Sequence, residues 1–254
     1  MTGPGVRRLA GYGVLLCVLP AVWVLVRASG AVPALLVPDP ARVAESLTAK
    51  VVTDPSALPL TAARALAGTA MGLALGTMLA VLAHLVPAVE PLTRVCGMIM
   101  RCVPVLALSP LIATFFGYGG GAAVATATVM SFFPSFALVG AALWRIPPAL
   151  ADVIRVTGGG TGTILRHVSL PIALPELVLA AKLTSCVGVL AALTAEFLTA
   201  NDGLGALLAR SQGLLDTPTV WAVLLTSLAT SLLAYEVMDL AERKTRVRLS
   251  LHKN

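Results

Sequence analysis

Long apolar runs dominate this sequence and restrict what it can fold into. They cover residues 9–26, 65–86, 102–118, 121–144, 177–197 and 220–240. Each is close to the roughly 20 residues that a helix needs to cross the hydrocarbon core of a membrane. Of the 254 residues, 57% are hydrophobic and 12% are charged, which leaves no room for a separate soluble domain. The sequence therefore predicts an all-α polytopic membrane protein of about six spans, with residues 1–254 forming a single transmembrane domain.

The first apolar run admits two interpretations. Arg7 and Arg8 precede it and the small residues 28–31 follow it, as in a secretory signal peptide. At 18 residues, the run is longer than the usual apolar core of such a signal. We therefore favour a first span that is retained.

Basic residues mark the two sides of the membrane, because they are enriched in the cytoplasmic segments of such proteins. If the N-terminus is cytoplasmic, five basic residues fall on the outer side: Arg27, Arg42, Lys50, Arg64 and Arg210. The thirteen others fall on the cytoplasmic side: Arg7, Arg8, Arg94, Arg101, Arg145, Arg155, Arg166, Lys182, Arg243, Lys244, Arg246, Arg248 and Lys253. This asymmetry predicts that both termini, and the segment between the fourth and fifth spans, are cytoplasmic.

Several function classes lack their residue patterns. The four cysteines lie in or beside apolar runs without a Cys-x-x-Cys pair, and the three histidines are far apart, so no metal site and no disulfide framework is expected. The formal charge of +6 is distributed over the span ends, which favours a membrane surface over nucleic acid as the partner. We expect no cofactor.

Small residues and prolines indicate how the spans pack. Gly68, Gly72, Gly76 and Ala80 recur every four residues and form a ridge on one helix face, where another backbone can approach closely. We expect this ridge to pack within one subunit rather than between subunits. Pro104, Pro110 and Pro134 are expected to bend the third and fourth spans, because proline removes a backbone donor and clashes with the preceding turn.

The longest cytoplasmic segment, about residues 145–172, carries the most information about function. Leu150, Val153, Ile154 and Thr157 have helical spacing while Asp152 and Arg155 point elsewhere, which predicts a short amphipathic helix at the membrane surface. Glycines at 158, 159, 160 and 162 then permit a sharp turn or a close backbone contact. The segment contains no Gly-x-x-x-x-Gly-Lys-Ser/Thr, so it does not bind ATP as a phosphate loop does.

The spacing in this segment resembles the cytoplasmic motif of binding-protein-dependent importer permeases. That motif is Glu-Ala-Ala, three residues, Gly, nine residues, then Ile-x-Leu-Pro. This chain has Asp152-Val153-Ile154, three residues, Gly158, nine residues, then Val168-Ser169-Leu170-Pro171. The spacing agrees throughout, Asp152 keeps the acidic charge, and Val153 and Ile154 depart from the paired alanines.

Two other stretches extend the resemblance to the permeases for taurine, alkanesulfonates and nitrate. They are RCVPVLALSPLIATFFGYG, from Arg101, and AEFLTANDGLGALL, from Ala195. The resemblance implies the type I fold of ATP-binding-cassette (ABC) importer permeases in the bacterial inner membrane. It also implies a homodimer, two ATPase subunits below, a solute-binding protein outside, and no enzymatic activity in the chain itself.

From the resemblance we expect an ATPase-coupling element at residues 150–165, with Gly158 at its tightest contact. The coupling residues expected in and beside it are Asp152, Arg155, Gly158, Gly159, Leu170 and Pro171. The residues considered for a translocation pathway are Arg101, Pro104, Pro110 and Lys182.

Charged residues near the spans have alternative roles. Arg101 and Lys182 either contact a solute or extend to the lipid headgroups, and we favour the headgroups because both are placed near span ends. For Glu196, at the end of the fifth span, an ion pair or a helix-end hydrogen bond is favoured over proton relay. Glu236 and Asp239 are expected to pair with the basic tail or to face solvent.

Two other classes of membrane protein compete with an importer permease. An independent secondary transporter needs paired intramembrane carboxylates or broken, repeated helices, and the sequence shows neither clearly. An intramembrane enzyme needs a buried nucleophile with a base, but the histidines lie at span ends, in the loop and in the tail. The solute stays open among taurine, another sulfonate, nitrate and a thiamin-precursor pyrimidine.

Overall fold

A computed structural model of the chain describes residues 18, 20–30, 32–33, 36–86, 88, 91, 95 and 104–251. Within this part, all regular structure is helical. The long α-helices are α3 (Ala57–Leu85), α6 (Gly120–Trp144), α9 (Leu170–Thr199) and α11 (Thr217–Leu251). The shorter elements are α2 (Pro40–Ser46), η1 (Leu47–Val52), η3 (Val105–Leu108), α5 (Ser109–Phe116), α7 (Pro148–Val156), α8 (Thr161–Ile164), η4 (Leu165–Ser169) and α10 (Gly203–Gly213).

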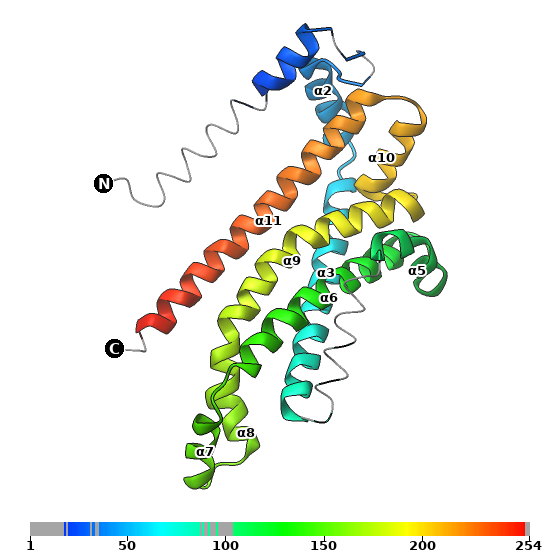
Figure 1. Cartoon of the computed structure of the whole chain (residues 1–254). Helices are drawn as coiled ribbons and strands as arrows, with labels where there is room; N and C mark the ends of the chain where they lie inside the picture. Colours follow the sequence, from blue (N-terminus) through cyan, green and yellow to red (C-terminus); the bar gives the residue numbers. More distant parts are fainter. Residues whose placement is uncertain are drawn as a thin grey trace, which may run out of the picture.

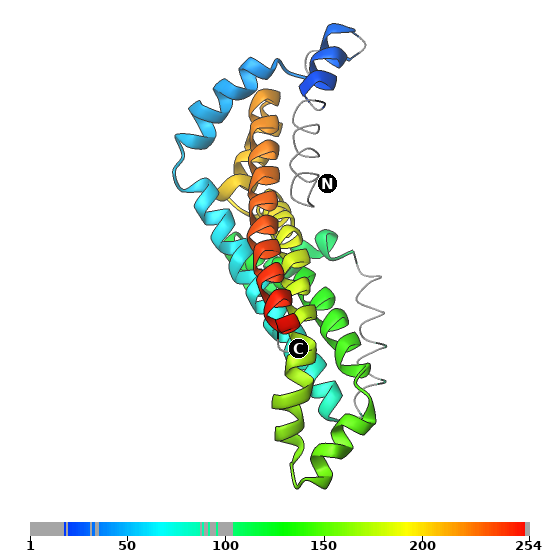
Figure 2. The same cartoon turned by 90° about the vertical axis from the view of Figure 1, so that its left-hand side faces the viewer.

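The long helices form an elongated bundle with two distinct ends (Figure 1). Helices α7 and α8 lie at one end, whereas α2 and α10 lie at the other, and the view turned by 90° agrees (Figure 2). We call these the α7 end and the α10 end. The all-α polytopic prediction is confirmed.

Four segments of the described chain are long and apolar enough to cross a membrane: Ala57–Leu85, Gly120–Trp144, Thr161–Thr199 and Thr217–Thr245. They contain the predicted fourth, fifth and sixth spans, and the predicted second span except for its last residue, Val86. Of the predicted first span, residues 18 and 20–26 are helical and the remainder lies outside the described residues.

The third predicted span differs from expectation over its described part. Residues 105–116 form the single 3₁₀ turn η3 and the eight-residue helix α5, which is about 12 Å long and cannot cross a membrane alone. Pro110 lies in the first turn of α5, where its missing N–H is not needed, so it begins a helix instead of bending one. Gly117, at φ 86°, ends α5. Pro104 lies before η3 and outside any helix, whereas Pro134 lies inside α6 as expected.

The ridge of small residues on α3 packs against α6, within the same chain. A β-carbon on Gly72 would collide with the carbonyl oxygen of Thr128, and one on Gly76 with that of Phe132. Ala80 at the end of the ridge is fully buried. The expectation that this ridge serves packing inside one subunit is confirmed.

Candidate functional site

Helix α7 forms at the α7 end because the sequence begins and ends it sharply. Two consecutive prolines start it, with Pro147 as N-cap and Pro148 in the first turn, where proline's fixed φ suits a helix. Its C-terminus closes with two backbone bonds, Gly158 N–H to Arg155 O (3.0 Å) and Gly159 N–H to Ile154 O (2.8 Å). This pair of bonds is the Schellman arrangement. The predicted short helix is therefore confirmed, with a defined stop at residue 158.

The two glycines of this stop have different physical roles. Gly158 has φ +85°, a left-handed conformation that side chains rarely adopt, but a β-carbon there would meet no atom within 4 Å. Gly159 has an ordinary φ, but a β-carbon on it would collide with the side chain of Ile154. Gly158 is thus required by the backbone and leaves open space outside the chain.

An apolar stripe covers one side of α7. Leu150, Val153 and Val156, three residues apart, are 45%, 63% and 88% exposed. Asp152 and Arg155 lie beside the stripe and pair with each other at 3.1 Å, with both side chains largely exposed. Apolar side chains gathered on the tip of a helix that projects from the bundle are typical of a contact surface.

The predicted coupling residues occupy two places in the loop. Asp152, Arg155, Gly158 and Gly159 belong to α7 and its cap, whereas Leu170 and Pro171 begin α9, after the π-helical turn η4. Leu170 is exposed.

The described residues among those considered for a pathway lie on different elements: Pro104 before η3, Pro110 in α5 and Lys182 in α9. Arg101 lies outside the described residues. Pro110 is in α5, which turns back into the first residues of α6: the Ala122 N–H donates to Gly117 O. The start of α6 lies beside Arg64, because a β-carbon on Gly120 would contact the Arg64 side chain. Arg64 in turn pairs with Glu196 on α9. Lys182 lies about 21 Å along α9 from Glu196.

Lys182 belongs to a buried charge network between α9 and α11. Its ammonium donates to Asp239 and, at 3.0 Å, to Glu242, and lies 4.7 Å from the centre of the Tyr235 ring. Only 8% of Lys182 is exposed, so the expectation that it extends to the headgroups is wrong. Asp239 also accepts from Arg243, which confirms its expected contact with the tail. Sequence reasoning missed the partners of Lys182, although 235, 239 and 242 share one helix face.

A second buried network ties α10 to α3 and α9 at the α10 end. Glu196 is fully buried and accepts hydrogen bonds from Arg64 Nη1 (2.9 Å), Thr61 Oγ1 (2.6 Å) and the Gly205 N–H (3.1 Å). Arg64 also pairs with Asp202 at 3.0 Å. The ion pair favoured for Glu196 is confirmed.

This network explains the Gly203-Leu204-Gly205 motif. Gly203 has φ +86°, and a β-carbon on it would lie 2.6 Å from the Glu196 carboxylate. A β-carbon on Gly205 would collide with the carbonyl oxygen of Leu193. Only glycine allows the start of α10 to close over the buried acid.

An ion pair outside the spans also holds the α10 end together. Lys50 in η1 pairs with Asp216, just before α11. Burial raises the pKa of Asp216, but hydrogen bonds from Lys50 and Thr219 outweigh it and hold that pKa below its ordinary value.

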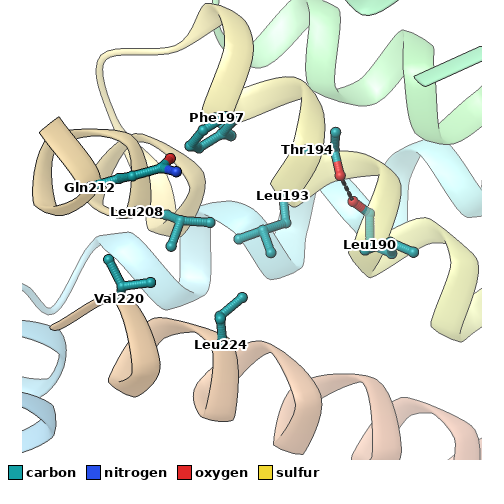
Figure 3. Close-up of a pocket in the computed structure, with 8 residues that line it drawn as sticks. All are labelled: Leu190, Leu193, Thr194, Phe197, Leu208, Gln212, Val220 and Leu224. Atoms are coloured by element: carbon teal, nitrogen blue, oxygen red, sulfur yellow. Dashed lines mark hydrogen bonds between the residues drawn. The ribbon is translucent and has the colours of Figure 1, made fainter. Parts of the chain in front are cut away.

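A cavity of about 320 Å³ lies among α9, α10 and α11 (Figure 3). Its lining is mainly leucine, valine and phenylalanine, and the Thr194 hydroxyl is satisfied by the Leu190 carbonyl at 2.8 Å. Gln212 supplies a polar side chain at its edge. The lining contains no charged residue, so this cavity lacks the chemistry of a site for an ionic solute.

The family profile described as "Binding-protein-dependent transport system inner membrane component" matches residues 72–247. This range contains α7, the glycines that end it, and the α9 residues of the two buried networks, Lys182 and Glu196. The chain belongs to this family. It is a multi-pass inner-membrane protein of the ABC importer permease class, whose members serve small solutes.

Relatives of this permease carry names for several solutes. It is 32% identical over 143 residues to the riboflavin transport system permease RibX of Chloroflexus aurantiacus. The match covers 56% of this chain and 53% of RibX, so this chain spans about half the length of RibX. It is 25% identical over 245 residues to the putative aliphatic sulfonates permease SsuC of Bacillus subtilis, covering 95% and 89%. It is 27% identical to the formylaminopyrimidine permease ThiX of Halalkalibacterium halodurans over 65% of this chain and 66% of ThiX.

The fold of this permease matches that of a solved transporter. An inward-facing form of the MetNI methionine ABC transporter superimposes with a TM-score of 0.65 at 23% identity, covering 76% of this chain and 98% of that chain. This likeness establishes the type I importer fold.

Proposed function

We propose that this permease moves a small solute into the cytoplasm and is driven by a separate ATPase, which it contacts through α7. In this proposal residues 1–254 are one transmembrane domain, and the functional complex holds two permease copies, two ATPases and an extracytoplasmic solute-binding protein. The α7 end faces the cytoplasm, and both termini lie on that side.

The exposed apolar stripe of α7 carries the coupling proposal. Leu150, Val153 and Val156 are exposed on α7, which lies at one end of the bundle (Figure 1). A short helix that is stopped rigidly by its glycine cap transmits force better than a mobile loop does. Asp152 and Arg155 are exposed and can add charged hydrogen bonds to a docked partner. Leu170 and Pro171 join this element to α9, so movement of α7 is passed to a spanning helix.

The solute class is proposed as a small organic molecule, most simply a sulfonate. SsuC matches nearly the full chain, whereas RibX and ThiX match about half and two thirds of it. A pyrimidine such as a thiamin precursor is the second candidate. Measuring which of these compounds raises the melting temperature of the partner binding protein distinguishes them, because a bound ligand stabilises the folded state.

The coupling proposal is tested by making the stripe polar without disturbing the fold. Val153→Asp and Val156→Asp alter exposed side chains, so membrane insertion and melting temperature should stay unchanged while co-purification of the ATPase falls sharply. Val52→Asp is the matched control, since Val52 is 66% exposed but lies at the α10 end. If the α7 variants retain the ATPase as well as Val52→Asp does, α7 is not the docking element.

A further inference from the structure

A second cavity, at the α7 end, combines an apolar interior with a cation that has no partner among the described residues. It measures about 400 Å³, within the range of about 300–1,000 Å³ typical of ligand pockets. Helices α3, α6 and α9 wall it, and its lining is Thr77, Val81, Val139, Arg166, Leu170, Pro171, Ala173, Leu174 and Leu177. We call it the Arg166 cavity.

The charge of the Arg166 cavity is not neutralised by the described part of the chain. Arg166, in the turn η4, is exposed and forms no hydrogen bond or ion pair with the described residues. The nearest acid in sequence on α9, Glu176, does not line the cavity, and its position on the helix places it well away from the face of Leu170, Leu174 and Leu177. The cavity therefore offers a positive mouth.

The remaining polar group of the lining is also unsatisfied. The Thr77 hydroxyl is buried and has no hydrogen-bond partner among the described residues. Most buried hydroxyls are paired in proteins, so this one points to an acceptor supplied from outside the described residues. An ester or phosphate oxygen would serve.

The surroundings of the cavity are apolar and open to the membrane. Leu170 and Leu174 of its rim are 45% and 41% exposed, and on α3 the neighbouring Met78 and Leu82 are exposed as well. These side chains belong to segments apolar enough to span a membrane, so the mouth opens onto an apolar surface that lipid can cover. Basic pockets between spanning helices near the membrane surface suit anionic lipid headgroups.

We propose that the Arg166 cavity binds one anionic phospholipid, with an acyl chain inside it and the phosphate paired to Arg166. The apolar cavity suits the hydrocarbon of an acyl chain. The Arg166 guanidinium pairs with the phosphate, and the Thr77 hydroxyl donates to an ester oxygen. Lipid binding here does not require an ATPase, so it is tested separately from the proposed coupling, although Leu170 and Pro171 belong to both.

Native mass spectrometry tests whether the charge of Arg166 selects an anionic lipid. The purified chain is given equal amounts of phosphatidylglycerol and phosphatidylcholine. The parent should retain phosphatidylglycerol preferentially. Arg166→Gln should weaken phosphatidylglycerol binding about fivefold, since a basic group contributes about 1 kcal/mol near such a lipid and 1.4 kcal/mol is tenfold. The control Arg145→Gln removes the same charge at the same end, outside the lining, and should bind like the parent. Equal phosphatidylglycerol binding by Arg166→Gln and the parent overturns the proposal.

A second pair of variants tests the cavity itself. Leu174→Trp fills the cavity and should reduce binding of both lipids, whereas Ile172→Trp, at a residue of equal exposure (40%) outside the lining, should not. If Leu174→Trp binds lipid as well as Ile172→Trp does, the cavity holds no lipid. If Leu174→Trp instead converts a dimer to a monomer, the cavity is covered by a second copy of the chain and again holds no lipid. Should Leu174→Trp fail to fold, the surface variant Arg166→Gln still decides the question.

Discussion

Removing Arg64 should destabilise the protein strongly, because it leaves the Glu196 carboxylate buried without a counter-ion. The Arg64 side chain is only 12% exposed and that of Glu196 is fully buried. Breaking such a pair by removing one partner costs about 3–5 kcal/mol. Thr61 and the Gly205 N–H still donate to the acid, so we expect the lower value, about 3 kcal/mol. At roughly 2–4 °C per kcal/mol for a chain of this size, Arg64→Met should lower the melting temperature by about 6–12 °C.

Thermal unfolding in detergent, followed by tryptophan fluorescence, measures this loss. Arg210→Met removes an exposed basic residue of α10 at the same end and serves as the control. The double variant Arg64→Met with Glu196→Leu should recover much of the stability, because an apolar replacement of both partners leaves no buried charge. A melting temperature for Arg64→Met equal to that of Arg210→Met would refute the assignment of Glu196 as a buried, charge-paired acid.

Three further outcomes are expected. In a background without the native cysteines, single cysteines at Ala49 and Thr161 should be labelled from opposite sides of the membrane by an impermeant reagent; labelling of both from outside intact cells would contradict the topology. Purified with its ATPase, the permease should give a mass of two permeases and two ATPases, and one permease per complex would exclude a homodimer. Gly72→Leu should prevent close packing of α3 on α6 and cost more than about 1–3 kcal/mol, seen as loss of monodisperse protein, whereas Gly162→Leu, in open space, should be tolerated.

The sequence predicted those elements whose signal is local. The apolar runs at 121–144, 177–197 and 220–240 each lie within a long helix, and the run at 65–86 does so up to Leu85. The glycine ridge on α3 packs as its spacing indicated. The short helix α7 was indicated by an amphipathic repeat, and the glycine cluster after it indicated a turn, which the structure places at Gly158 and Gly159. These features depend on helix periodicity and on the backbone freedom of glycine, which a single sequence displays directly.

Features that depend on distant partners were less accessible. Lys182 is 57 residues from Asp239, so its burial depends on how α9 packs against α11. The third span was predicted from the hydropathy of residues 102–118. Hydropathy does not show that Pro110 lies in the first turn of a helix or that Gly117 ends that helix. The Arg166 cavity is formed by three helices and has no counterpart in any one segment.

Solute-stimulated ATP hydrolysis by the complete complex tests the central claim most directly. Gly158→Trp puts a bulky side chain on the face of the α7 cap that is open in the isolated chain, whereas Gly158→Ala imposes the same unfavourable φ without the bulk. Strain of this kind costs about 1–3 kcal/mol. If α7 docks into the ATPase, Gly158→Trp should insert normally yet lose stimulated hydrolysis and transport, while Gly158→Ala retains a substantial part of both. A Gly158→Trp complex that assembles, hydrolyses ATP and transports like the parent would contradict coupling through α7.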